Sequence, residues 1–189
     1  MSRLIHLNGP SRVGKSTLAR RYAAEHPGVL NLDIDVLVGL VGGWQNDFDS
    51  ALRTARELGS TMAVAHLHDG HDVVLPQLIT SHDESPWAEE LAELAGAEYV
   101  EFALLAGSDE HRRRFGAKQP EHEVDAWVQD ALGESDGALL EKIVGDLDDY
   151  LAGRPETIRI DTGAQTPEET YAVIVGALRH PAMGVKQNG

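Results

Sequence analysis

Gly9-Pro10-Ser11-Arg12-Val13-Gly14-Lys15-Ser16 is the stretch that decides the fold of this 189-residue chain. It has the spacing G-x-x-x-x-G-K-S, it directly follows an apolar run at 3–8, and a helical pattern begins at its last residue. This order of strand, loop and helix distinguishes a phosphate-binding loop from a chance match to the same letters. The glycines let consecutive N–H groups point inward as an anion-binding nest, and the helix start adds the positive end of its dipole. The sequence therefore predicts a polyphosphate site after the first strand.

The loop also predicts individual contacts. Lys15 is expected to reach the β- and γ-phosphates of a nucleotide, and the hydroxyl of Ser16 to ligate Mg²⁺. The residues expected to bind the nucleotide are Gly9, Ser11, Arg12, Val13, Gly14, Lys15, Ser16 and Thr17. Such a loop does not by itself indicate a kinase, because GTPases, motor ATPases and regulatory switches share it.

Outside this loop, short apolar runs alternate with longer helical patterns. The predicted strands are 3–8, 29–33, 72–75, 99–105 and 157–160. The predicted helices are 16–26, 47–67, 86–95, 123–132, 138–151 and 167–178, with a further helix beginning in 108–116. Alternation of this kind predicts right-handed crossovers and a parallel sheet with helices on both faces. We expect a single α/β domain over 1–180 and a flexible tail at 181–189.

Charge and composition narrow the class of ligand. The chain has 31 Asp and Glu against 16 Lys and Arg, a formal net charge of −15, and no cysteine. This charge disfavours nucleic acid and anionic membranes as partners, and the lack of cysteine excludes disulfides and thiol catalysis. Basic residues gather before residue 22 and at 112–114, which favours a compact anionic ligand unless it reflects chance clustering. With no apolar run of ~20 residues and no signal-peptide pattern, we expect a cytoplasmic protein; its oligomeric state stays open.

Two aspartates follow the second predicted strand, in Asn31-Leu32-Asp33-Ile34-Asp35. Residues i and i+2 of an extended segment face the same way, so both carboxylates are expected to point toward the phosphate loop at the carboxyl end of the sheet. We assign metal binding to Asp33, with Ser16, and the general base to Asp35, although the spacing leaves the two roles interchangeable. The alternative is an Asx turn that caps the next helix.

With these residues in place, the sequence resembles the small P-loop kinases of the zeta-toxin and chloramphenicol phosphotransferase kind, which are labelled AAA-type domains. Its layout is also similar to that of shikimate and gluconate kinases. The loop and the D-x-D pattern resemble shikimate kinase, and Asp35-Val36-Leu37 resembles the segment around the base of chloramphenicol phosphotransferase. The order of elements is similar over 3–178, but the sharp motifs are confined to 9–16 and 33–35. The resemblance implies a single P-loop NTPase domain with sheet order 2-3-1-4-5, Mg-ATP as phosphate donor and a small hydroxyl compound as acceptor.

The third strand departs from the pattern of many relatives. No acidic residue follows 72–75, where a metal-binding carboxylate could lie, which disfavours a motor or switch ATPase and leaves the metal role to Asp33. Gln77 lies at the expected acceptor position and is a candidate substrate contact. Trp44 is a second candidate, or a core residue, and Arg56 is a third, or a solvated helix residue.

Consecutive arginines occupy 112–114, at a position that resembles the mobile lid of small P-loop kinases. We place the lid at about 108–125 and expect Arg112 or Arg113 to reach over the transferred phosphate, unless the arginines are paired with neighbouring acids. The loop after the fifth strand resembles the adenine-side loop of such kinases and makes Gly163 a nucleotide contact; Pro167 at a helix start is the plainer explanation.

The sequence thus favours a phosphotransferase that moves the γ-phosphate of Mg-ATP to a hydroxyl of a small molecule. Lys15, Asp35, Arg112 and Arg113 are the expected catalytic residues. Two alternatives stay open: a regulatory NTPase without an acceptor, and a kinase of nucleotide-sugars or polynucleotides, of which a polymer substrate is disfavoured by the negative charge.

Overall fold

The computed structural model describes residues 1–82, 85–107, 110, 113–114, 119–134 and 138–179. Its five strands are β1 (Arg3–Asn8), β2 (Leu30–Asn31), β3 (Val73–Leu75), β4 (Glu98–Leu105) and β5 (Ile158–Asp161). They form one parallel sheet in the order β2-β3-β1-β4-β5, as the resemblance implied. The phosphate loop therefore leaves the middle strand. The predicted tail at 181–189 lies outside the described residues.

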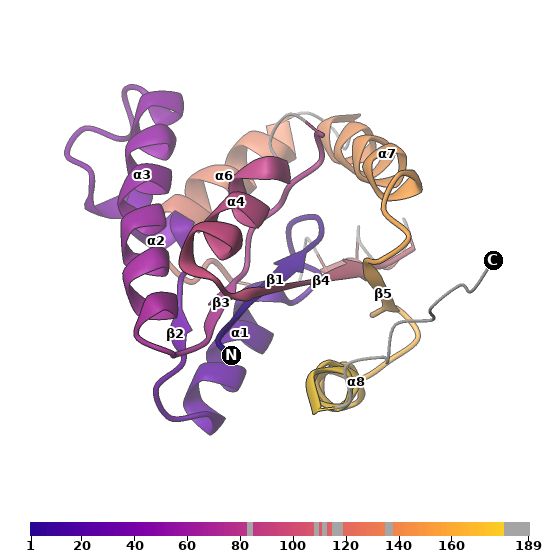
Figure 1. Cartoon of the computed structure of the whole chain (residues 1–189). Coiled ribbons are helices and arrows are strands. Elements are labelled where there is room, and N and C mark those ends of the chain that lie inside the picture. Colours follow the sequence, from indigo (N-terminus) through magenta and orange to yellow (C-terminus); the bar gives the residue numbers. More distant parts are fainter. Residues whose placement is uncertain (83–84, 108–109, 111–112, 115–118, 135–137, 180–189) are drawn as a thin grey trace.

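Helices cover both faces of the sheet (Figure 1). They are α1 (Lys15–Glu25), α2 (Ile34–Leu40), α3 (Phe48–His68), α4 (Ser85–Ala95), α6 (Glu123–Glu134), α7 (Ala138–Ala152) and α8 (Pro167–Arg179). No described helix is both long enough and apolar enough to cross a membrane.

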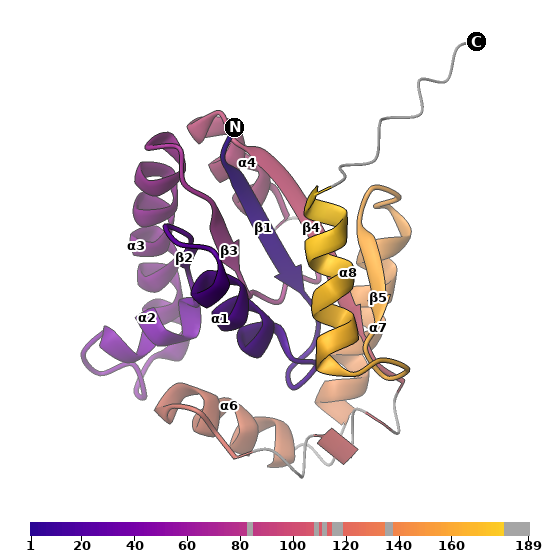
Figure 2. The ribbon, with the colours of Figure 1, turned by 90° about the horizontal axis from the view of Figure 1, so that it is seen from below.

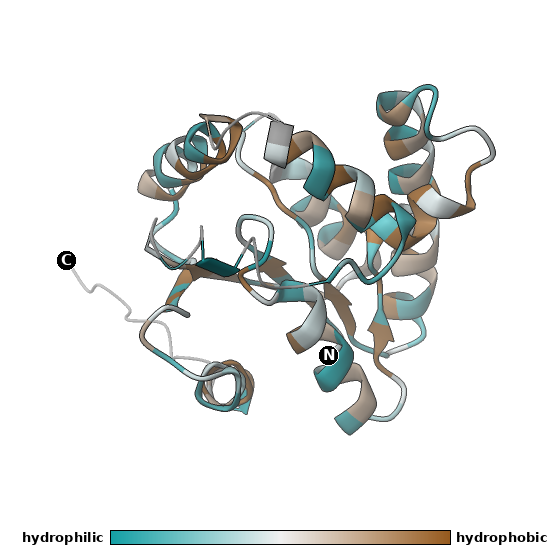
Figure 3. Cartoon of the chain, turned by 180° about the vertical axis from the view of Figure 1, so that it is seen from behind, coloured by the Kyte–Doolittle hydropathy of each residue, from teal (hydrophilic) through white to brown (hydrophobic). Residues whose placement is uncertain are grey.

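Alternation along β1 divides the core between these two layers. Leu4 packs in the cluster that α3, α4 and α7 share, whereas Ile5 and Leu7 pack against α1 and α8. Side chains at i and i+2 of a strand share a face, so His6 and Asn8 lie on the α4 and α7 side, where they are fully buried. Coloured by hydropathy, the strands are mostly brown and the helices alternate brown and teal (Figure 3). The central strand is thus apolar on one face and partly polar on the other.

The second strand is shorter than predicted, and a helix was missed. β2 covers only Leu30–Asn31, and α2 begins at Ile34 with Asp33 as its N-cap. The carboxylate of Asp33 accepts a hydrogen bond from the N–H of Asp35 at 3.2 Å, which satisfies a donor of the first turn. The prediction of two aspartates on one side of an extended strand was therefore wrong, because a capping residue ends the strand before Asp35. The alternative of a capping turn is the one observed.

One helix lies outside the two layers. Seen from below, α6 crosses the molecule beyond the end of β1 from which the phosphate loop emerges (Figure 2). It contacts α2, and Val124 of α6 is buried in the same core cluster as Val38. The carboxyl edge of the sheet is thus covered by α2 and α6, where ligands of open parallel sheets bind.

Candidate active site

The phosphate loop has the backbone of an anion nest. Gly9 and Gly14 have φ of 144° and 106°, and Arg12 has φ of 69°. A Cβ on Gly9 would lie 2.4 Å from the carbonyl oxygen of Leu104, so no other residue fits there. Lys15 Nζ donates to the carbonyls of Gly9 and Pro10 at 2.7 and 2.8 Å and so closes the loop on itself. These positive φ values turn the loop's N–H groups toward one side, as phosphate binding requires.

A cleft of about 580 Å³ lies on one side of this loop. It brings together five residues predicted to contact the nucleotide, namely Arg12, Val13, Gly14, Thr17 and Gly163. The Gly163 N–H is held by the side chain of Asp161 at 2.9 Å, which shapes the loop after β5. The cleft joins the phosphate loop to the loop after β5, so the two segments predicted to contact a nucleotide form one site.

A smaller pocket of about 70 Å³ lies on the other side of the loop. Predicted residues in its lining are Ser11, Arg12, Gly14, Lys15, Ser16 and Asp35. The carboxylate of Asp35 therefore shares a pocket with the lysine and the serine that close the phosphate loop, although it comes from a helix and not from a strand end. Gly9 precedes both pockets and lines neither.

Asp35 has an unusual proton affinity. Its partial burial and, next, the negative charge of Asp33 raise the pKa of Asp35 to about 6, while Lys15 opposes the shift. Burial disfavours the charged form of a carboxyl, and a nearby like charge does the same. At neutral pH the group is ionised, but it holds a proton far more readily than an exposed aspartate. A carboxylate with these properties beside a phosphate loop is suited to general-base chemistry.

Part of the small pocket comes from residues that were not selected as site residues, although they lie within the predicted lid at about 108–125. Glu121, His122 and Asp125, at the start of α6, complete its lining. His122 Nδ1 accepts the N–H of Asp125 at 3.1 Å and so caps the helix. Because this nitrogen is an acceptor, the proton of a neutral His122 lies on Nε2. The signal that could have identified it is a histidine directly before an acidic first turn, which alone is a weak one.

Two ion pairs hold α6 against the phosphate loop and α1. Arg12 lies 3.4 Å from Asp125 and donates to Gln129 at 2.6 Å, and Arg20 pairs with Glu121 at 2.5 Å. The Arg12 side chain is only 3% exposed, so its contacts form between groups largely removed from water. Arg12, which was predicted to contact the nucleotide, thus also links the phosphate loop to the outer wall of the small pocket, formed by Glu121, His122 and Asp125.

The arginine run is only partly described. Arg112 lies outside the described residues, so its predicted role stays a prediction. Arg113 lines the larger cleft, where it pairs with Glu110, and its side chain is 74% exposed. Arg114, which was not selected, donates to the hydroxyl and carbonyl of Thr162 at 3.0 and 2.6 Å. Arg114 therefore attaches the arginine run to the loop after β5, whereas the side chain of Arg113 is largely exposed to solvent.

Three predicted acceptor contacts have other surroundings. Trp44 is 5% exposed and packs edge-on against Trp127, with ring centroids 6.3 Å apart, which is the core alternative. Arg56 lies over the ring of Trp87 at 5.4 Å, between α3 and α4. Neither residue lines the small pocket, and we leave both out of the proposed site. The backbone carbonyl of Gln77 forms a hydrogen bond with His6. Gln77 does not line the small pocket, whereas the neighbouring Pro76 does.

The ligand types for Mg²⁺ are present at the pocket. Ser16 and Asp35 line it, and Asp33 is close enough for its charge to act on Asp35. No group of three or more His, Cys, Asp or Glu in the described part of the chain could hold a metal by itself. This set fits Mg²⁺, which uses one or two protein oxygens and takes its other ligands from water and nucleotide phosphates.

Comparison with known proteins agrees with this geometry. The chain matches the model of the AAA domain family over residues 4–135, and it belongs to that family. No curated protein matches it. Among solved structures it is similar to the APS kinase of Mycobacterium tuberculosis in complex with AMPPNP and APS, with TM-score 0.64, 19% identity and coverage of 94% and 98% of the two chains. A sugar kinase from Janibacter sp. gives TM-score 0.63 at 15% identity, with 95% of each chain covered.

A third similar structure is the tunicamycin resistance protein of Deinococcus radiodurans, with TM-score 0.60, 17% identity and coverage of 94% and 96%. At such identities the likeness concerns the fold, which is that of small P-loop kinases. Together, the family match, the fold and the phosphate loop define a P-loop domain of the AAA family.

Proposed function

We propose that this protein is a kinase that transfers the γ-phosphate of Mg-ATP to a hydroxyl group of a small molecule. The observation that carries the proposal is the pocket shared by Asp35, Lys15 and Ser16. A switch protein needs only the phosphate loop and its metal. A transferase also needs a base beside the phosphates, and Asp35, whose pKa is raised to about 6, has the required place and proton affinity.

In the proposed reaction the acceptor oxygen attacks the γ-phosphorus. A bond forms between these two atoms, the bond from the γ-phosphorus to the oxygen bridging it to the β-phosphate breaks, and ADP leaves. The hydroxyl proton passes to the carboxylate of Asp35, which is ionised at neutral pH. Little covalent chemistry is asked of the protein, so its contribution is positioning and charge stabilisation.

The phosphate loop and its surroundings supply that stabilisation. Lys15 contributes a positive charge at the mouth of the loop, and we place Ser16 and Asp33 as ligands of Mg²⁺, which neutralises phosphate oxygens when bound. Arg113 lines the larger cleft and is the described arginine to which we assign the lid role, and Gly163, in the same lining, would contact the nucleotide. The outer wall formed by Glu121, His122 and Asp125 would lie against the acceptor.

The similar structures support a small acceptor, since an APS kinase and a sugar kinase are among them. The net charge of −15 adds support, because it disfavours a polymeric nucleic acid substrate.

The test is ADP release from Mg-ATP, alone and with a panel of sugars, nucleosides, aminoglycosides and phenicols. Lys15→Ala serves as the blank because it removes the loop's charge from the phosphates. We expect one acceptor class to stimulate turnover in the wild type and not in the blank. Steady ADP release that no acceptor changes would favour a regulatory NTPase and contradict the kinase proposal.

A further inference from the structure

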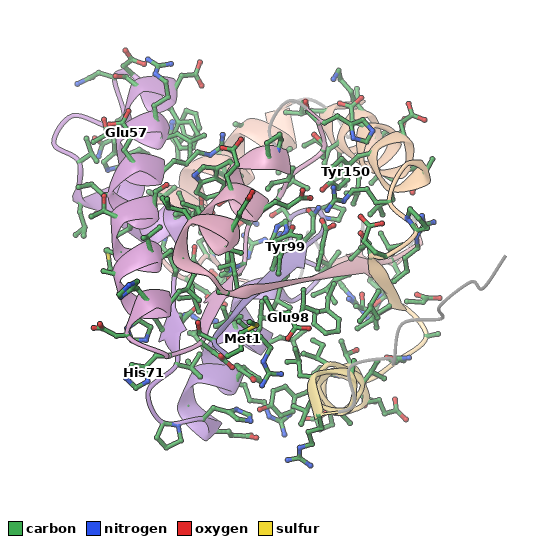
Figure 4. All side chains as sticks on the ribbon, in the orientation of Figure 1. Met1, Glu57, His71, Glu98, Tyr99 and Tyr150 are labelled. Atoms are coloured by element: carbon green, nitrogen blue, oxygen red, sulfur yellow. The ribbon has the colours of Figure 1, made fainter. Side chains whose placement is uncertain are left out.

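A closed set of buried polar side chains lies beneath the phosphate loop. At its centre is Glu101, in the middle of β4 and 4% exposed. Its Oε2 accepts hydrogen bonds from Arg154 at 2.9 Å and Thr157 at 2.7 Å, and its Oε1 accepts one from Asn8 at 2.9 Å. Figure 4 labels Tyr150, on α7, whose hydroxyl donates to the same Oε1 at 3.3 Å. This carboxylate lies on the face of the sheet opposite to α1.

Asn8 connects this carboxylate to the loop. It is the last residue of β1, and its Oδ1 accepts the N–H of Gly9 at 2.8 Å and that of Ile79 at 3.0 Å. Its Nδ2 donates to the carbonyl of Ile79 at 2.9 Å and to Glu101. An ionised carboxylate only accepts hydrogen bonds, so Glu101, together with the carbonyl of Ile79, requires the NH₂ end of Asn8 to face it. The oxygen end must then face Gly9, and the orientation of the amide is determined.

Gly9 is held from both of its polar groups. Asn8 accepts its N–H, and Lys15 donates to its carbonyl at 2.7 Å. The carbonyl of Leu104 in β4 fills the space beside its Cα. A displacement of Asn8 would therefore move Gly9, the first residue of the phosphate loop. Because Lys15 donates to the carbonyl of Gly9, Lys15 would move as well.

The charge state of the set follows from its contacts. His6 Nε2 faces the carbonyl of Gln77 at 2.8 Å and must donate, so Nδ1 accepts from the hydroxyl of Tyr99 at 2.8 Å when the ring is neutral. Burial lowers the pKa of His6, which favours that neutral form. Burial acts to raise the pKa of Glu101, but its interaction with His6, next the hydrogen bonds from Thr157 and Asn8, and last the charge of Arg154 outweigh burial and hold that pKa below its ordinary value. Glu101 is thus an ionised acceptor, with Arg154 as its main counter-ion.

We propose that Glu101 is a positioning residue for nucleotide binding, which acts by orienting Asn8 and, through Asn8, the Gly9 end of the phosphate loop. A buried ion pair adds little stability over a well-packed apolar replacement, because removing two charges from water costs much of what their attraction returns. The expected contribution of Glu101 is therefore to the geometry of the loop. The inference rests on the proposed function only in requiring that the loop binds Mg-ATP.

The test compares two pairs of variants by their dissociation constant for Mg-ATP, from calorimetry, and by their thermal unfolding midpoint. Glu101→Gln keeps the shape of the side chain but offers an NH₂ group either to Asn8 or to Arg154 and Thr157. Asn8→Ala removes the link itself. Thr157→Val is the matched control, because it removes a hydrogen bond from the same carboxylate on the side away from Asn8. Glu98→Gln, at the exposed start of β4, is the control for charge (Figure 4).

We expect Glu101→Gln and Asn8→Ala to weaken Mg-ATP binding at least tenfold. We expect Thr157→Val to lower the unfolding midpoint while its dissociation constant stays within twofold of wild type, and Glu98→Gln to change neither. Should Glu101→Gln not fold, Asn8→Ala carries the test. Wild-type affinity in a folded Glu101→Gln or in Asn8→Ala, or affinity losses that follow the unfolding midpoint in all variants including Thr157→Val, would overturn the inference.

The binding measurement uses no acceptor, so this inference and the kinase proposal fail in different ways. A wild-type protein that binds no Mg-ATP removes both. A wild-type protein that binds Mg-ATP and transfers to nothing removes only the kinase proposal.

Discussion

The two hollows beside the phosphate loop differ in how they are built. The larger cleft, of about 580 Å³, is lined by the loop, the start of α1, residues 110 and 113–114, and the segment after β5, with uncharged residues such as Val13, Thr17 and Gly163 among the arginines. The smaller pocket, of about 70 Å³, has charged side chains at half of its lining residues, Asp35 and Lys15 among them. The larger cleft thus suits the base and sugar of a nucleotide, which are recognised by shape. The small pocket suits the reacting groups, whose charges change during the proposed transfer.

This difference assigns separate tasks to the two sides of one loop. Substitutions in the larger cleft should act on nucleotide affinity, with the exception of Arg113, which is assigned to the transferred phosphate, and substitutions in the small pocket should act on the rate of transfer. Arg12 and Gly14 line both the cleft and the pocket, so they link the two. Each prediction below tests whether affinity and rate separate in this way.

The largest effect is expected from Asp35→Asn. The amide keeps the size of the side chain but cannot accept the acceptor's proton, so kcat should fall by roughly 10²–10⁴. Affinity for Mg-ATP should stay within a few-fold, because the nucleotide cleft is untouched. Acceptor-dependent ADP release and calorimetry on the same preparation measure both. Full turnover in this variant would exclude Asp35 as the base.

The same substitution should stabilise the fold. The pKa of Asp35 is raised on folding, so the proton is held more tightly in the folded protein, and the folded state loses stability as pH rises from about 4 through about 6. At pH 7 the whole loss is present, and Asp35→Asn should raise the free energy of unfolding by about 1–2 kcal/mol, after allowance for partial solvation. Urea unfolding at pH 7 and at pH 3.5 measures it.

The pH dependence of this change in stability is its control. The gain in the free energy of unfolding should be near zero at pH 3.5, where Asp35 is largely protonated in the folded and the unfolded protein alike. An equal gain at both pH values would attribute the effect to packing.

The pH profile gives the third test. Transfer requires ionised Asp35, so kcat/KM should fall about tenfold between pH 7 and pH 5, with a midpoint near the pKa of about 6. If the larger cleft determines nucleotide affinity and the small pocket determines the rate, the affinity for Mg-ATP should change much less over this pH range. The residual activity of Asp35→Asn should not fall between pH 7 and pH 5; if it still fell by the same factor, Asp35 would not be the group that titrates in the wild type.

The smallest effects are expected at the two described arginines of the run. Arg114→Ala breaks two hydrogen bonds to Thr162 and should raise KM for ATP about tenfold, with a smaller change in kcat. Arg113→Ala removes a largely solvated side chain and should lower kcat several-fold, far less than the loss of a fully engaged arginine finger. Steady-state kinetics with ATP varied distinguishes the two, and the reverse pattern would exchange their roles.

Sequence reasoning located the nucleotide side well and the acceptor side poorly. Gly9, Gly14, Lys15 and Ser16 lie within eight consecutive residues, and their chemistry depends on local backbone geometry, which a motif records. Asp35 was selected for a wrong geometric reason, since it lies in a helix capped by Asp33. Glu121 and Asp125 fall within the predicted lid, but their place beside Asp35 was missed, because they are 86 and more residues away from it in a segment with no motif of its own.

Buried polar residues were also beyond sequence reasoning. A glutamate within the apolar stretch 99–105 is an anomaly that the sequence shows, but its partners come from β1, α7 and the approach to β5. Trp44 and Arg56 show the opposite error. The sequence suggested that both contact the substrate, but in the structure they pack against Trp127 and Trp87.

The sequence alone determined the class of this protein: alternating apolar runs and helical patterns specify a parallel α/β sheet, and eight residues specify a phosphate loop after its first strand. These signals are local, since they arise from side-chain periodicity and from the backbone freedom of glycine. Only the tertiary structure decided what lies beside that loop. Asp35, the start of α6 and Glu101 reach it through folding, and the pKa of Asp35 and the orientation of Asn8 depend on burial and on neighbours that are distant along the chain.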